Sequence, residues 1–153
     1  MSARVLVLDR AIDAIGAVVD PEIPVLTISD LGILRGVSLN GGRLVVTITP
    51  TYSGCPAMRQ IESDVERAAR AEGFDDVEVR LVHSPAWTTD WIGPEAKQAL
   101  ADFGIAPPTK IGDVVCPRCD GSAEVVSRFG STACKALMVC SRCGEPFDLL
   151  KEH

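Results

Sequence analysis

Two identically spaced cysteine pairs near the end of the chain constrain the fold more than any other feature of the sequence. Two residues separate Cys116 from Cys119, two separate Cys140 from Cys143, and twenty residues lie between the pairs. Each C-x-x-C turn can direct two thiolates to one point, and two such turns joined by a hairpin suit a tetrahedral zinc ion. Because four sulfur ligands leave no open coordination position, the pattern predicts a structural zinc. The alternatives are a redox pair, an iron–sulfur cluster or four ordinary buried cysteines.

The composition indicates a globular protein rather than a membrane or disordered one. Of 153 residues, 46% are hydrophobic and 24% are charged, and no apolar run reaches the length of a membrane span. The start, Met1–Arg4, lacks the apolar region of a signal peptide. We therefore expect a cytoplasmic protein whose clustered thiols bind metal instead of forming disulfides. The net charge of −6 disfavours binding to nucleic acid or to anionic membranes.

The hydrophobic pattern of the first hundred residues predicts a small layered α+β domain. Apolar residues at helical spacing alternate with β-branched runs of period two, in the order αββαβ, and the helices are expected on one face of the sheet. The predicted elements are a helix over residues 8–19, strands over 33–39 and 43–49 joined at Asn40–Gly42, a helix over 56–72, a strand over 77–82 and a short helix over 94–103.

Two consecutive prolines mark the predicted boundary between domains. Pro107 and Pro108 favour an extended spacer because each fixes its backbone and lacks an N–H donor. The prediction is an α+β domain over residues 1–104, a linker over 105–113 and a zinc ribbon over 114–153. Since a ribbon of this size cannot support a core of its own, metal binding would supply much of its folding free energy.

Cys55 stands where the chain leaves a strand and enters a helix. Gly54 supplies the turn, and Pro56 occupies the first helical position. Free amides and the helix dipole at this place stabilise a thiolate. Such a thiolate could hold a soft metal or an iron–sulfur cluster, or attack a substrate. The alternative is a compact cysteine that merely packs at the helix entry.

Three further residues are candidates for metal chemistry. Cys134, beside Lys135, is either a reactive thiol or a small packed hydrophobe. Asp20 and Glu22 flank a proline after the first helix, and they either ligate iron or are solvated turn charges. No phosphate loop, dinucleotide fingerprint or oxygen-activating iron triad is visible, so no residue is assigned a catalytic role.

The aromatic pair Trp87 and Trp91 has two interpretations. The spacing of four residues could present an aromatic surface to a partner, or both rings could close the small core.

Several segments resemble a known family. Residues 20–24, 30–33 and 49–56 are similar to the iron–sulfur assembly domain typified by bacterial SufT. Together with the cysteine pairs, residues 87–92, 104–108 and 129–137 resemble the PaaD family, the D components encoded with the ring epoxidase that acts on phenylacetyl-CoA in aerobic phenylacetate degradation.

The resemblance implies a maturation factor that brings iron or an iron–sulfur cluster to the oxygenase and reductase subunits. By position, Cys55 matches the cysteine of the assembly domain, Asp20 and Glu22 match its acidic turn, and the paired cysteines match the zinc-ribbon extension. The role of Cys134 is open, as is a homodimer that bridges metal between two copies of Cys55.

The alternative function is a stoichiometric subunit of the epoxidase that carries electrons or shapes the acyl-CoA site. A ribbon that binds nucleic acid is disfavoured, because acidic and basic side chains balance over residues 114–153.

Overall fold

The computed structural model describes residues 3–52 and 54–153, so Met1, Ser2 and Ser53 of the motifs above lie outside the described residues. The chain forms two compact units that divide after Trp87. Their elements in chain order are α1 (Ala3–Gly16), β1 (Val19–Asp20), β2 (Ile23–Thr27), α2 (Ile28–Leu31), β3 (Leu34–Asn40), β4 (Arg43–Ile48), α3 (Ala57–Ala71), β5 (Val77–Leu81), the 3-10 turn η1 (Thr89–Trp91), α4 (Pro94–Phe103), β6 (Ile105–Ala106), the 3-10 turn η2 (Ile111–Asp113), β7 (Ala123–Ser127), β8 (Lys135–Cys140) and β9 (Pro146–Leu150).

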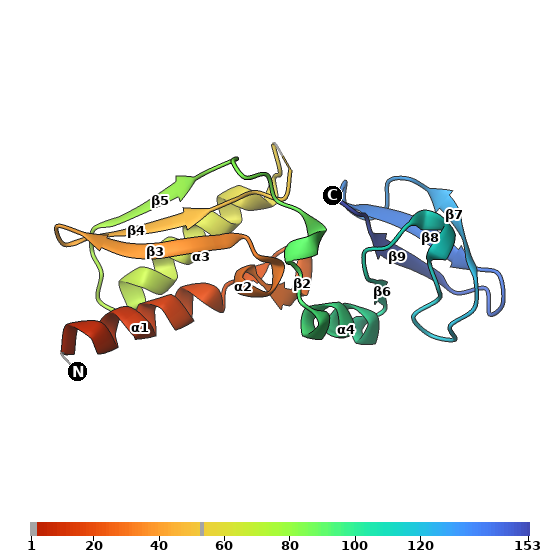
Figure 1. The fold of residues 1–153 in the computed structure, drawn as a ribbon, viewed down its shortest axis with the longest axis horizontal. Helices are drawn as coiled ribbons and strands as arrows, with labels where there is room; N and C mark the ends of the chain where they lie inside the picture. Colours follow the sequence, from red (N-terminus) through yellow and green to blue (C-terminus); the bar gives the residue numbers. More distant parts are fainter. Residues whose placement is uncertain (1–2, 53) are drawn as a thin grey trace. The chain divides into compact units, whose positions relative to one another are not determined.

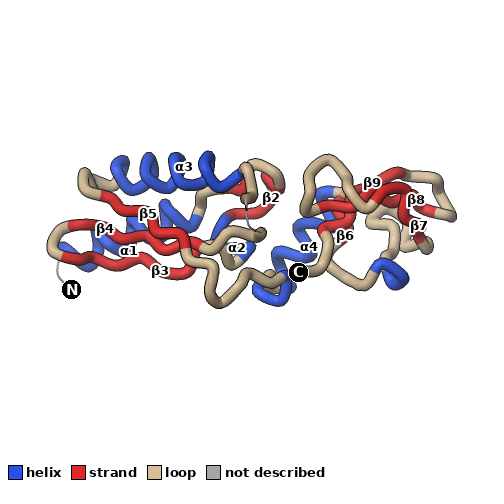
Figure 2. Tube along the Cα trace, turned by 90° about the horizontal axis from the view of Figure 1, so that it is seen from above, coloured by secondary structure: helices blue, strands red, loops and turns tan. Residues whose placement is uncertain are grey.

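A three-stranded sheet in the order β3-β4-β5 forms the frame of the first unit. Strands β3 and β4 pair antiparallel through the turn at Gly41 and Gly42, which both have positive φ. Strand β5 pairs in parallel with β4 because α3 makes the crossover between them. Figures 1 and 2 show α1 and α3 on the same side of this sheet. The predicted α+β domain with its helices on one face is therefore confirmed.

Helix α3 fixes the position of the chain next to Cys55, the candidate metal-transfer residue. Its buried residues Met58, Ile61 and Val65 recur every three or four positions and form one apolar stripe. On the exposed side Arg70 pairs with Glu66 at 3.5 Å, one helical turn apart. Burial of the stripe therefore fixes where the first turn of α3, next to Cys55, lies.

The chain between α1 and β3 differs from the prediction. The first helix ends at Gly16 rather than at Val19, because the following β-branched residues are extended and Val18 O accepts a hydrogen bond from Ile28 N at 2.8 Å. Strands β1 and β2 and the short helix α2 were not predicted. Thr27 begins α2 with a capping box, in which Thr27 and Asp30 each accept the other's backbone N–H at 3.0 Å.

A four-stranded sheet in the order β6-β9-β8-β7 dominates the second unit. Strand β6 lies parallel to β9, and the other pairs are antiparallel. The core includes two of the paired cysteines and consists of Ala106, Val114, Cys116, Ala136, Met138, Cys140, Phe147 and Leu149. The segment predicted as a linker, residues 105–113, begins with β6 and contains η2. The use of these bounds as the domain boundary stays a prediction.

Within the described ranges, none of the helices combines the length and the apolar character that crossing a membrane requires.

Candidate metal centre

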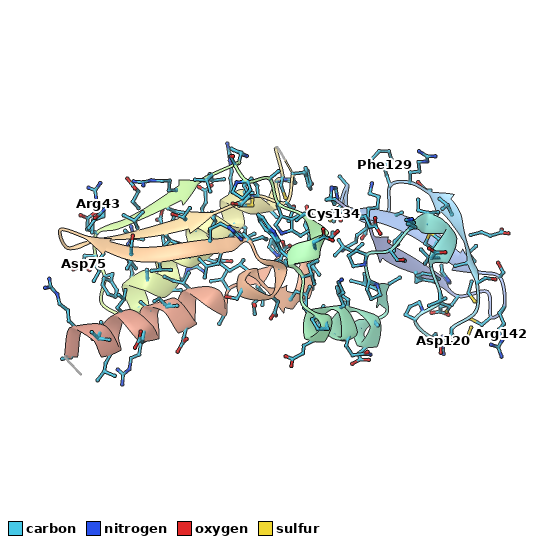
Figure 3. The ribbon with its side chains drawn as sticks, viewed as in Figure 1. Arg43, Asp75, Asp120, Phe129, Cys134 and Arg142 are labelled. Atoms are coloured by element: carbon cyan, nitrogen blue, oxygen red, sulfur yellow. The ribbon has the colours of Figure 1, made fainter. Side chains whose placement is uncertain are left out.

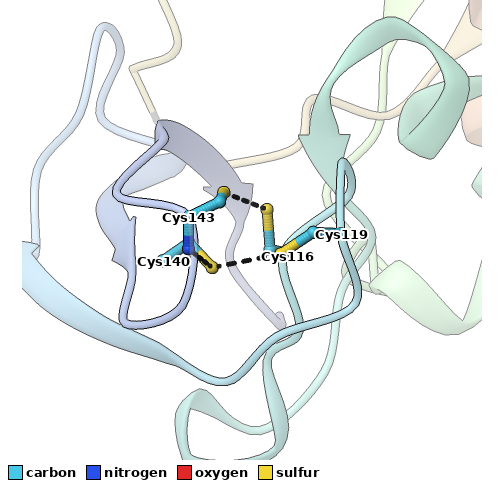
Figure 4. Close-up of side chains that lie close together, drawn as sticks. All are labelled: Cys116, Cys119, Cys140 and Cys143. Atoms are coloured by element: carbon cyan, nitrogen blue, oxygen red, sulfur yellow. Dashed lines mark hydrogen bonds between the residues drawn. The ribbon is translucent and has the colours of Figure 1, made fainter.

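Four cysteine sulfurs converge at one end of the ribbon sheet, as Figure 4 shows. The Sγ atoms of Cys116, Cys119, Cys140 and Cys143 all lie within 4.8 Å of one another. Cys116 and Cys143 are 3.8 Å apart, and Cys119 and Cys140 are 3.5 Å apart. A tetrahedron with metal–sulfur bonds of about 2.3 Å has sulfurs about 3.8 Å apart. The donor set therefore fits a single tetrahedral ion, and the predicted ligands are brought together.

The two sulfur turns, residues 116–121 and 140–145, have the same backbone construction. In the first, Cys116 N donates to Gly121 O at 2.8 Å, and Asp120 N donates to Cys116 O at 2.9 Å. In the second, Cys140 N donates to Glu145 O at 2.9 Å, and Gly144 N donates to Cys140 O at 3.0 Å. Each turn also directs a backbone N–H at the sulfur of its own first cysteine. Donors aimed at a sulfur stabilise it as a thiolate, the form that binds metal.

An arginine from each turn reaches across to the other turn. Arg118 of the first turn donates to Glu145 Oε2 at 2.9 Å, and Arg142 of the second donates to Cys119 O at 3.4 Å. Four thiolates around a divalent ion carry a net charge of about −2, so two nearby guanidinium groups offset it. The sequence pattern did not predict this role, although both arginines hold the same place in C-P-R-C and C-S-R-C.

The sulfurs differ in their affinity for protons. The pKa of Cys140 falls to about 6 because the backbone N–H groups of Cys143 and Arg142 donate to its sulfur. Their effect outweighs burial, which raises the pKa. The pKa of Cys119 rises to about 12: a backbone hydrogen bond from Gly121 favours its thiolate, but the sulfur contact with Cys140, burial and the other thiols outweigh it. Because metal binds the thiolate form, binding releases the protons that the sulfurs hold.

Cys134 lies away from the sulfur quartet. It precedes β8, whereas Cys140 ends that strand, so the strand separates the two residues by about 20 Å. Figure 3 shows Cys134 at the opposite end of this unit from Asp120 and Arg142 of the sulfur turns. Its Sγ is buried and lies 3.0 Å from Thr132 Oγ1. Cys134 therefore cannot join the same ion, and its transfer role stays a prediction.

Cys55 lies at the entry to α3, as its sequence position predicts. Gly54 has φ of +79°, and Cys55 N donates to Tyr52 O at 3.2 Å. Cys55 O accepts from Met58 N at 3.2 Å, which starts the helical hydrogen bonding. The residue is only 8% exposed. Its transfer role stays a prediction, since among the described residues the paired cysteines alone form a metal-ligand cluster.

The acidic turn is built around a buried carboxylate. Asp20 is 4% exposed, and its Oδ1 accepts from Glu22 N at 2.7 Å and from Ile23 N at 3.1 Å. These bonds close the turn between β1 and β2, so Asp20 is not a solvated charge. The binding of iron by Asp20 and Glu22 stays a prediction.

The tryptophans have different environments. Trp87 is buried, and its Nε1 donates to Leu31 O at 2.8 Å, which ties the end of the first unit to α2. This ring belongs to the core. Trp91 ends η1 in the second unit and is half-buried.

Two protein-family models match separate segments of the chain. The model of the iron–sulfur cluster assembly protein family covers residues 8–81, and that of the PaaD zinc beta ribbon domain covers residues 106–151. A relative from Escherichia coli (strain K12), which is named as a subunit of a 1,2-phenylacetyl-CoA epoxidase, is 48% identical over 140 residues. The match covers 86% of this chain and 85% of the relative. The chain belongs to the PaaD family.

The first unit of this PaaD-family protein also matches shorter proteins. The Fe-S protein maturation auxiliary factor SufT of Staphylococcus aureus (strain USA300) is 38% identical over 85 residues, which cover 54% of this chain and 96% of the relative. A crystal structure of a domain of unknown function from Bacillus anthracis is 31% identical with a TM-score of 0.56, and the match covers 62% of this chain and 92% of that one. The family thus joins an iron–sulfur assembly domain to a four-cysteine ribbon, which places the chain among accessory or assembly proteins.

Proposed function

We propose that this PaaD-family protein is a maturation factor that delivers iron or an iron–sulfur cluster to the oxygenase and reductase subunits of a phenylacetyl-CoA epoxidase system. The observation that carries the proposal is the position of Cys55, at the entry to α3 and inside the segment that matches the assembly family. The name of the Escherichia coli relative supports the choice of epoxidase system.

The two units divide the metal chemistry between them. In the ribbon, four thiolates saturate a tetrahedral ion, which we take to be zinc because closed four-sulfur sites are typical of structural zinc. Such an ion is held permanently and is not the cargo. A single cysteine at a helix entry leaves positions for ligands from the client, so Cys55 suits a species that must be passed on.

Burial of Cys55 protects the sulfur and restricts its use. A thiol that is 8% exposed is shielded from oxidants, and little of its surface is accessible to cargo. Asp20 and Glu22 supply oxygen ligands for iron in this proposal, although Asp20 Oδ1 also holds its own turn.

The decisive experiment compares Cys55→Ser with Cys134→Ser, since both cysteines are buried and lie outside the quartet. Each variant is co-expressed with the epoxidase subunits, and zinc content, iron content after anaerobic purification and epoxidase activity are measured. We expect Cys55→Ser to fold and keep its zinc but to yield epoxidase without its iron centres. Cys134→Ser tests the second candidate thiol: loss of the iron centres would assign Cys134 a part in transfer, and activity equal to that of the unmodified protein would remove it. Full epoxidase activity with Cys55→Ser would remove Cys55 from the mechanism.

A second function, a stoichiometric component that takes part in turnover, is favoured by the name of the Escherichia coli relative, which makes that protein a subunit of its epoxidase. The test is to remove this protein from the assembled, metal-loaded epoxidase and assay again. Maturation predicts undiminished activity, whereas a role in turnover predicts that activity is lost and returns when the protein is added back.

A further inference from the structure

A small cavity lies inside the second unit, between the end of α4 and the two sulfur turns. Its volume is about 230 Å³. Sites for drug-sized ligands and cofactors measure about 300–1,000 Å³, so this cavity suits a side chain rather than an acyl-CoA. Both sulfur turns line it, the first through Pro117 and Arg118 and the second through Glu145 and Pro146.

Two phenylalanines line the cavity. Phe147 lines it and belongs to the buried core of the ribbon. Phe103, the last residue of α4, also lines it and is 58% exposed. A phenylalanine that leaves more than half of its surface in water contributes little to folding. Together with Pro117 and Pro146, the two rings supply much of the apolar part of a recess whose lining is also polar.

The charges around the recess favour a cation. Glu145 is already paired with Arg118 at 2.9 Å, so these two charges offset each other. Asp102 also lines the recess; its Oδ1 accepts from Gln98 Nε2 at 2.9 Å, and within the described part of the chain it has no ion-pair partner. The C-terminus of α4, at Phe103, adds the negative end of the helix dipole. The exposed ring of Phe103 offers a face on which a guanidinium can stack.

We propose that this recess docks a segment of a partner protein that carries a bulky apolar side chain with an arginine or lysine next to it. The apolar side chain enters between Phe103 and Phe147, and the cation lies over Phe103 near Asp102. This docking site deepens the proposed function. It rests on that function only for the statement that the partner is a protein that receives the metal.

The probe is a library of short random peptides displayed on phage and selected on the full-length, zinc-loaded protein. The best peptide is then synthesised, and its Kd is measured by fluorescence anisotropy at low and at high salt. We expect the selected sequences to share a bulky apolar residue adjacent to arginine or lysine, and binding to weaken at high salt. Failure to enrich any sequence, or enrichment of acidic sequences, would overturn the proposal.

Variants with matched controls locate the binding. Phe103→Ser should weaken the peptide at least about tenfold, and Asp102→Lys about fivefold or more, because each removes one half of the recognition. The controls are Val126→Ser, at an apolar side chain that is 59% exposed on β7, and Glu124→Lys, at an exposed acid on the same strand. They should change Kd by less than about twofold. Equal losses in the test and control variants would place the peptide elsewhere and refute the assignment.

The same assay separates docking from metal transfer. Cys55→Ser should bind the peptide as tightly as the unmodified protein, because Cys55 belongs to the other unit and does not line the recess. If epoxidase maturation survives Cys55→Ser but Phe103→Ser still loses the peptide, the proposed transfer fails and the docking site stands. If maturation needs Cys55 but Phe103→Ser binds normally, the docking site fails alone.

Discussion

Asp120 and Gly144 occupy the same place in the two sulfur turns, four residues after the first cysteine of each pair. Both have a left-handed backbone, with φ of 62° at Asp120 and 77° at Gly144, and both donate an N–H to the carbonyl of that cysteine. Only glycine enters this region without a steric cost, and aspartate is among the few other residues that tolerate it.

The equivalence predicts opposite effects of two substitutions. Gly144→Ala should destabilise the zinc-loaded ribbon by about 1–2 kcal/mol, because alanine has a Cβ and no side chain that compensates the left-handed backbone. Asp120→Gly should be neutral or slightly stabilising. Thermal unfolding in the presence of excess zinc measures both changes, and an Asp120→Gly loss as large as that of Gly144→Ala would show that the Asp120 side chain has a separate role.

Gly121 allows the two sulfur turns to approach each other. A Cβ at this position would lie 2.7 Å from Arg142 Cβ and 3.1 Å from Cys140 Sγ. We expect Gly121→Ala to push the turns apart and lower zinc affinity by about tenfold or more. Gly112→Ala is the control, because a Cβ there meets nothing within 4 Å. Competition with a chromogenic chelator reports both affinities, and unchanged binding by Gly121→Ala would contradict the close approach.

Asp20 allows a structural role to be separated from an iron-binding one. Asp20→Ala should lower the free energy of unfolding by about 1–3 kcal/mol, because the partly buried N–H of Glu22 and the buried N–H of Ile23 lose their acceptor. Asp20→Asn keeps an oxygen in that place and should cost less, while it removes the negative charge. Denaturant unfolding gives the stabilities. If Asp20→Asn is stable but its purified form contains no iron, the carboxylate is a ligand, whereas normal iron content would limit Asp20 to the turn.

Removal of the ribbon metal should affect one unit only. Chelation takes away the ion that joins the two sulfur turns, so protection of amides in β7, β8 and β9 should be lost. Amides in β4 and α3 should keep their protection because the first unit has its own core, which includes Ile48 and Ile61. Hydrogen exchange followed by mass spectrometry resolves the two, and simultaneous loss in both units would show that they fold as one.

His153 predicts a dependence of stability on pH. Burial, and then the positive charge of Lys151, hold the pKa of His153 below its ordinary value of 6.5. The folded state therefore binds fewer protons than the unfolded state near this pH, so the stability from neutral His153 is full above pH 6.5 and falls as the pH drops toward the folded pKa. Lys151→Met should raise the pKa of His153 and Lys110→Met should not, as an NMR titration of the imidazole would show.

The parts of the structure that sequence predicted are those with strong local signals. The hairpin at Gly41 and Gly42 and helix α3 follow from turn chemistry and periodicity, and the metal ligands follow from cysteine spacing alone. Helix α2 has a capping box at Thr27 and Asp30, but its four residues are too few to show a helical period in the sequence.

Other features depend on contacts that no local pattern encodes. The pairing of the two-residue strand β6 with β9 joins segments more than forty residues apart. The crossing of Arg118 and Arg142 between the turns, and the role of Asp20 in closing its own hairpin, likewise require the folded backbone. Cys55 is the reverse case: its place at the helix entry was predictable, but its burial was not.

The pairing of β6 with β9 affects how the ribbon can be isolated. A fragment that starts at residue 114 lacks Ile105 and Ala106, which lie beside Asp148 and Leu149 in the sheet. Excision at that point would bare the hydrogen-bonding groups along the outer side of β9, and such an unprotected border recruits strands from neighbouring molecules. A clone intended to yield a monodisperse ribbon should therefore begin upstream of residue 105.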